Sequence, residues 1–210
     1  MIGLKGSVIN HTYLMWNRSL AFNILAMLAL FVAYFITNSP EVLIFVQAFF
    51  IITVPLGVLE STQISFVNNW NTFERSFAIS PKFLILSRYI MFICASLLCA
   101  IIWRISPFHG LHETEILFDF FILTTQLMGI IYLPVMYLLN PNKKNSATII
   151  LLGVMFGAGA LSFFLTVQAQ CVLCVLCCNP WATAAIIAGL YVISATLSIF
   201  FDNIHRGRAN

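Results

Sequence analysis

The sequence predicts an all-α integral membrane protein with six transmembrane helices. Of its 210 residues, 61% are hydrophobic and only 8% are charged, whereas soluble proteins carry about 25% charged residues. Six apolar segments are each close to the roughly 20 residues that a helix needs to cross the hydrocarbon core. They are residues 20–37, 42–59, 83–103, 116–139, 147–167 and 181–201. We expect all six to be helices, because unpaired backbone groups are too costly in lipid.

The basic residues predict how the spans are oriented. In a six-span arrangement, nine of the ten Lys and Arg residues lie on one side of the membrane, and only Arg104 lies on the other. Basic residues accumulate on the cytoplasmic side, so we expect both termini in the cytoplasm. The nine residues are Lys5, Arg18, Arg75, Lys82, Arg88, Lys143, Lys144, Arg206 and Arg208.

The loops between the spans are too short for a soluble domain, so residues 1–210 are predicted to form one transmembrane domain. Leu4, Val8, Thr12 and Met15 recur on one helical face, which predicts an interfacial helix over residues 1–19 on the inner leaflet. A frayed terminus that leads into the first span is the alternative. The first apolar run is followed by the sequence TNSPE and not by a small-x-small cleavage site, so we expect it to remain as a span.

Residues 60–82 contain the longest polar interruption of the chain and are expected in the cytoplasm. Within this loop Trp70, Phe73 and Phe77 are spaced three and four residues apart, so one face of a short helix would be aromatic. The Ser80-Pro81 step is expected to end this helix, because proline disfavours helical backbone in the preceding residue and suits the first turn of a new helix. A helix of this kind lies on a surface or docks into the groove of a partner.

This loop resembles the connection between the second and third spans in the membrane subunits of ABC-2 type exporters. In that family an acidic residue is followed by an aromatic helix and then by a proline step. The topology is similar along the whole chain, and the sequence is similar over about residues 60–88. The matching residues are Glu60, Trp70, Phe73, Glu74, Ala78, Ile79, Ser80, Pro81 and Lys82.

The resemblance implies that the aromatic helix is a coupling helix, seated in a cleft of a separately encoded ABC ATPase subunit. Trp70 and Phe73 are then the anchors of the interface, Glu74 and Arg75 set its register and orientation, and Phe77 with the Ser80-Pro81 step completes the segment. ATP and Mg²⁺ belong to the ATPase, and this chain has no G-x-x-x-x-G-K-[ST] phosphate loop. The chain is therefore not expected to be an enzyme or to hold a cofactor. An amphipathic loop lying on lipid headgroups is the alternative.

The resemblance also implies a homodimer, or a heterodimer with a similar membrane subunit, that works with two ATPase subunits and has no nucleic-acid partner. The outer loops are too short to form a vestibule, so we expect a hydrophobic or amphipathic substrate, such as a small peptide, a toxin or a lipid-like molecule. Three alternatives remain open. One is a haem-exporter-type membrane subunit, which predicts a patch of histidine or tryptophan. The others are a membrane redox or metal protein and a scaffold that only recruits a soluble partner.

Three amides, Asn23, Gln47 and Gln126, lie well inside the predicted spans. Polar groups at such positions either form hydrogen bonds between helices or line a translocation path. Arg88 and Asp119 lie near the ends of spans, where a charged side chain is expected to reach the headgroups by snorkelling. Further positions with an expected role in the helices are Pro55 and Pro134, as sites of kinks, and Gly153 with Gly157, as a small face for helix packing.

Four cysteines before the last span read C-x-x-C-x-x-C-C, and three interpretations of them remain open. They are apolar packing, one or two disulfides on an oxidising outer side, and a metal site. Because no histidine or acidic residue lies among them, no metal site is predicted. The family resemblance implies a short re-entrant helix over this outer segment, residues 168–180. The cysteines are Cys171, Cys174, Cys177 and Cys178, and His109 and His112 in another outer loop are expected to be solvated.

Overall fold

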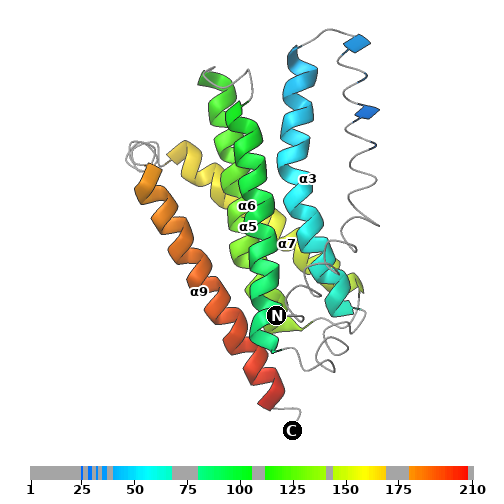
Figure 1. Ribbon diagram of the computed structural model, residues 1–210, viewed down its shortest axis with the longest axis vertical. Coiled ribbons are helices and arrows are strands. Elements are labelled where there is room, and N and C mark those ends of the chain that lie inside the picture. Colours follow the sequence, from blue (N-terminus) through cyan, green and yellow to red (C-terminus); the bar gives the residue numbers. More distant parts are fainter. Residues whose placement is uncertain are drawn as a thin grey trace.

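A computed structural model shows five long helices packed as a bundle (Figure 1). It describes residues 40–67, 80–105, 112–140, 144–168 and 180–207, together with residues 25, 28, 29, 32, 35 and 36. All of these residues except Ser80 and Asn140 are helical. The helices are α3 (Pro40–Val67), α5 (Pro81–Ile105), α6 (His112–Leu139), α7 (Lys144–Gln168) and α9 (Pro180–Gly207).

Each of the five helices contains a stretch that is long and apolar enough to cross a membrane. The all-α class and five of the six expected spans are thus supported by helix length and composition. Most of the first expected span, residues 20–37, lies outside the described residues, as does the interfacial segment, residues 1–19. The described helices begin or end up to eight residues away from the boundaries that the apolar runs predicted, because helical backbone continues past the lipid-compatible stretch.

Consecutive helices run in opposite directions, and two long-range hydrogen bonds fix which ends meet. The Gln63 side-chain amide, near the end of α3, donates to Thr148 Oγ1, near the start of α7, at 2.9 Å. His205 Nε2, near the end of α9, lies 2.8 Å from the carbonyl oxygen of Leu138 at the end of α6. We call this end of the bundle, which lies lower in Figure 1, the basal end. It holds the last turns of α3, α6 and α9 and the first turns of α5 and α7.

The end of α3 differs from the predicted boundary, because the helix continues through Glu60 to Val67. Residues 60–67 had been expected in the polar loop. Their hydroxyl groups are satisfied within the helix: Ser61 Oγ donates to the Val58 carbonyl at 2.7 Å, and Ser65 Oγ donates to the Ser61 carbonyl at 2.9 Å. Hydroxyls that bond back to the preceding turn can be buried without a further partner, so a polar sequence here still forms a buried helix.

The start of α5 and the end of α6 follow from local sequence. Pro81 is the first residue of α5, and the backbone N–H groups of Phe83 and Leu84 donate to the Ser80 carbonyl at 2.9 and 3.3 Å. The expectation that a new helix begins at the Ser80-Pro81 step is confirmed. Helix α6 ends at Leu139, and Asn140 takes up a left-handed conformation with φ of 42° while its N–H donates to the Met136 carbonyl at 2.9 Å. Asparagine is one of the few residues that adopt this helix-ending conformation readily.

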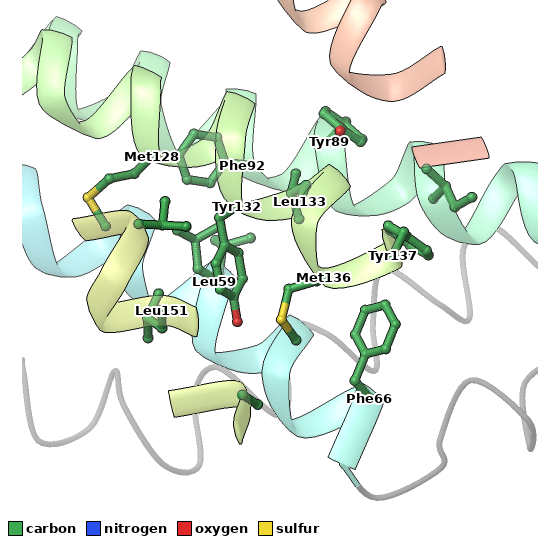
Figure 2. Close-up of a cluster of buried hydrophobic side chains, with 14 of the residues drawn as sticks. Leu59, Phe66, Tyr89, Phe92, Met128, Tyr132, Leu133, Met136, Tyr137 and Leu151 are labelled. Carbon is green, nitrogen blue, oxygen red and sulfur yellow. The ribbon is translucent and has the colours of Figure 1, made fainter. Parts of the chain in front are cut away.

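The main apolar core lies between α3, α5, α6 and α7, with Tyr191 of α9 also part of it, and its centre is fully enclosed (Figure 2). Leu59, Phe92, Tyr132, Leu133 and Met136 have no exposed surface. Pro55 and Pro134, expected as kink sites, are buried within α3 and α6, which both continue through them. The interior is therefore built mainly from the basal halves of three helices, with α7 covering one side.

The outer faces of α7 and α9 expose large apolar side chains, including Phe156 at 77%. A membrane-spanning helix presents such a face to lipid. Gly153 and Gly157, expected as a helix-packing face, lie on this exposed side of α7, and a Cβ built on either glycine meets no described atom within 4 Å. Within the described residues, the small face is not used for packing.

Gly129 of α6 lies where α5 and α6 approach one another closely. A Cβ built there would overlap the ring of Phe92 on α5, which is fully buried and cannot swing aside. We expect Gly129→Ala to lower the free energy of unfolding by about 1–3 kcal/mol, because the destabilisation by overpacking is larger than the stabilisation by the higher helix propensity of alanine.

Denaturation of the purified protein in mixed micelles with increasing SDS measures this cost. Gly157→Ala is the matched control, because its Cβ points into open space and its helix propensity rises by a similar amount. Equal stability of the two variants would contradict the close α5–α6 packing.

Candidate functional site

The expected coupling residues fall into two groups. Trp70, Phe73, Glu74, Arg75 and Phe77 lie outside the described residues. Ser80 and Pro81 are described, and they form the cap and first residue of α5 at the basal end. The structure therefore fixes the two helix ends that residues 68–79 connect, which are the end of α3 at Val67 and the start of α5 at Pro81.

Arg88 is the largest fully buried side chain of the described residues, with 1% of its surface exposed. The expectation that it reaches the headgroups by snorkelling is wrong. Because α5 begins at Pro81, Arg88 lies two turns inside the helix, on the face that packs against α3 and α6. Snorkelling would require this face to point to lipid or water, and it points into the bundle.

The guanidinium of Arg88 lies between two aromatic rings from different helices. Its central carbon is 5.0 Å from the ring centroid of Phe66 on α3 and 5.5 Å from that of Tyr137 on α6. Arg88 Nη1 also donates a hydrogen bond to the Tyr137 hydroxyl. The two rings meet edge to face, with centroids 5.0 Å apart, and Figure 2 shows them together at one edge of the core. We call Arg88, Phe66 and Tyr137 the arginine clasp.

The contacts of the arginine clasp suit a cation that is shielded from water. A guanidinium over an aromatic face is held by about 2 kcal/mol or more when it is desolvated, and it is hydrated more weakly than an ammonium group. Glu60, near the end of α3, is half-buried at the same end of the bundle. The basal end of the bundle thus holds charged groups in an otherwise apolar surrounding.

A second polar feature runs along one face of α9. Five of its residues are spaced three, four, four and three apart, and this face packs against α5 and α6. The Tyr89 hydroxyl on α5 lies 2.7 Å from Ser194 Oγ and 2.8 Å from Ser198 Oγ. Ser194 Oγ also donates to the Ile130 carbonyl on α6 at 2.6 Å. We call this face the α9 seam; its residues are Tyr191, Ser194, Ser198, Asp202 and His205.

Tyr191, the first residue of the α9 seam, contacts one of the amides singled out from the sequence. The Tyr191 hydroxyl donates to Gln126 Oε1 on α6. Gln126 thus makes the hydrogen bond between helices that was one of its two expected roles. Gln47 is half-buried on α3, and Asn23 lies outside the described residues. A part in a translocation path stays a prediction for all three amides.

The cysteine cluster, Cys171 to Cys178, lies outside the described residues, so its three interpretations stay open. Two further cysteines are described on α5: Cys94 is exposed, and Cys99 packs in a small apolar cluster with Ile51 and Val54 of α3. Within the described part of the chain, no group of three or more His, Cys, Asp or Glu residues is arranged to hold a metal ion. His109 is not described, and nor is the side chain of His112.

Both polar features leave a pattern in the sequence, although neither pattern entered the predictions above. The five polar residues of the α9 seam recur at helical spacing inside an apolar span, which indicates a polar stripe along one face. Arg88 follows Pro81 by seven residues, so a helix that starts at the proline already places the arginine two turns deep. The partners of each group could not be read from the sequence, because they lie on other helices.

The described groups at the basal end include hydroxyls, an amide, aromatic rings, the guanidinium of Arg88, the carboxyl group of Asp202 and the imidazole of His205. Their hydrogen bonds join helices, which suits the positioning of chain segments. No family model matches the chain, and no similar protein was found among the curated proteins or the solved structures.

The hydroxyl of Tyr89 ties α5 to α9, so its removal should weaken the α9 seam. We expect Tyr89→Phe to lower the free energy of unfolding by about 1 kcal/mol, the usual worth of a hydrogen bond between membrane helices. SDS titration in mixed micelles again provides the measurement.

Tyr132→Phe is the matched control for Tyr89→Phe. Tyr132 is buried on the neighbouring helix, but its hydroxyl has no hydrogen-bond partner among the described residues. Its removal should leave stability unchanged or slightly raise it, because an unsatisfied buried hydroxyl carries a desolvation cost. A loss of stability in the control as large as that in Tyr89→Phe would show that the seam bonds contribute nothing specific.

Proposed function

We propose that this chain is the membrane subunit of an ABC-2 type exporter and that residues 68–79 couple it to a separate ATPase. The observation that carries the proposal is the sequence pattern of this connection. Glu60 is followed by the aromatic residues Trp70 and Phe73, then by Glu74, and finally by a Ser-Pro-Lys step. The pattern joins two long apolar helices, α3 and α5, whose connected ends lie at the same end of the bundle.

The basal end supports the proposal on mechanical grounds. A coupling segment can transmit the movement of an ATPase only if the helices at its two ends resist independent displacement. Here the end of α3 and the start of α5 are tied to each other and to α6 through the arginine clasp. A displacement of the segment would therefore move three helices together.

The proposed exporter consists of two copies of this subunit, or of this subunit and a similar one, with two ATPase subunits on the cytoplasmic side of a bacterial plasma membrane. ATP and Mg²⁺ are bound by the ATPase, and this chain provides the path for a hydrophobic or amphipathic substrate. Because the described outer surface is mostly apolar, a substrate of that class could reach the subunit from the bilayer as well as from the cytoplasm.

Co-purification from the native host tests the proposal. We expect an ATP-binding protein with a phosphate-loop sequence to be retained by the wild-type chain and reduced at least about tenfold by the double substitution Trp70→Ala/Phe73→Ala. Each aromatic anchor of an interface is typically worth about 2 kcal/mol or more, and 1.4 kcal/mol is a tenfold change in affinity. Mass spectrometry identifies the retained protein, and quantitative blotting gives its ratio to the membrane chain.

Phe83→Ala is the matched control for this experiment. Phe83 is an aromatic residue in the first turn of α5, close to the same end of the bundle, but it is 52% exposed on the helix surface. Its removal should leave the retained ATPase unchanged. If no ATP-binding protein accompanies the wild-type chain, the proposed function is wrong.

A further inference from the structure

We infer that Arg88 is a positioning residue for the coupling step: it holds the last turn of α3 and the first turns of α5 in the arrangement that the ATPase recognises. This inference rests on the proposed function. It concerns residues that the structure describes, and it assigns to a buried arginine a task beyond the stability of the fold.

The first step of the argument is the location of the arginine clasp. Phe66 is the last residue but one of α3, and Arg88 lies two turns into α5. Through the contact between Phe66 and the Arg88 guanidinium, 5.0 Å from ring centroid to central carbon, the end of one helix is set against the start of the next. Tyr137, two residues before the end of α6, closes the clasp from a third helix.

The second step is that the clasp resists gradual displacement. An arginine carries its charge permanently, and moving that charge out of its aromatic surroundings into lipid is costly. A shift of α3 against α5 therefore weakens the cation–π contact with Phe66, and a shift of α6 against α5 breaks the hydrogen bond to Tyr137. The clasp consequently favours one defined arrangement of the helix ends over a range of similar ones.

The third step separates positioning from general stability. Arg88 and its neighbour Tyr89 point to different partners: Arg88 contacts α3 and α6, whereas Tyr89 bonds to Ser194 and Ser198 on α9. Both side chains are buried, both make polar contacts, and they follow one another in the chain. Of these two residues, Arg88 is the one that contacts the end of α3. A comparison of their variants therefore tests this contact between two residues that are equally buried and lie on the same helix.

The experiment uses the full chain purified from the native host with its ATPase, in four forms: wild type, Arg88→Gln, Tyr89→Phe and Ser96→Ala. Ser96 is a buried residue of the same helix, and its hydroxyl has no partner among the described residues. Two quantities are measured for each form. One is the ratio of ATPase to membrane chain, and the other is amide hydrogen exchange in peptides from residues 60–67 and 97–105.

We expect Arg88→Gln to speed exchange about tenfold in residues 60–67, because the last turns of α3 lose their anchor, while exchange in residues 97–105 stays unchanged. The same variant should retain at least about tenfold less ATPase. Tyr89→Phe and Ser96→Ala should match the wild type in both quantities. Arg88→Lys, which keeps the charge without the planar group, should fall between wild type and Arg88→Gln.

Several results would overturn the inference. Unchanged exchange in residues 60–67 of Arg88→Gln would show that the clasp does not order the helix end. Faster exchange with an unchanged ATPase ratio would show that the ordered end is not what the ATPase recognises. An equal loss of ATPase in Tyr89→Phe would show that Arg88 acts only through the general stability of the fold. Faster exchange in residues 97–105 of Arg88→Gln would show the same.

A failure of the proposed function gives a different pattern, because the wild-type chain would then retain no ATPase. In that case the proposed role of Arg88 in coupling is wrong as well. The exchange rates still show whether the arginine clasp orders the end of α3. Phe66→Leu provides a second route to the same contact if Arg88→Gln does not fold. It keeps the apolar volume, removes the ring that faces the guanidinium, and should move both quantities in the same direction by a smaller factor.

Discussion

A permanent positive charge enclosed in an apolar bundle is the constraint on which the basal end of this protein depends. Removing an arginine from water costs several kcal/mol, and the cost is met only where the guanidinium keeps its specific contacts. Arg88 finds two aromatic rings and a tyrosine hydroxyl, which come from the ends of α3 and α6. Those helix ends cannot move away from α5 without exposing the charge to lipid or leaving it unpaired.

The two neighbouring side chains Arg88 and Tyr89 join the first turns of α5 to different neighbouring helices. The arginine clasp joins α5 to α3 and α6, and the bonds of Tyr89 join it to the α9 seam. Helix α7 is attached to the same end by the bond between Gln63 and Thr148. Polar contacts thus link all five described helices near the basal end, whereas the outer faces of α7 and α9 are apolar.

The sequence predicted the elements of this arrangement better than their contacts. Apolar run length identified the five helices, and the Ser80-Pro81 step located the start of α5, because these are local properties of the chain. The end of α3 was placed too early, since Ser61 and Ser65 look like loop residues until their hydroxyls bond to the preceding turn. Arg88 was placed near the right depth with the wrong surroundings. Which way a helix face points is decided by packing between helices, which residue spacing alone does not specify.

Site-specific photo-crosslinking measures the central claim, that residues 68–79 contact an ATPase, most directly. A benzoyl-phenylalanine in place of Phe73 reacts with whatever lies beside it in membranes of the native host. The account predicts a crosslinked product that contains this chain and a phosphate-loop ATPase, and that disappears when the photoreactive group replaces Phe83 on the exposed surface of α5. A crosslink at position 73 to lipid alone would contradict the account, because the aromatic helix would then lie on the membrane surface.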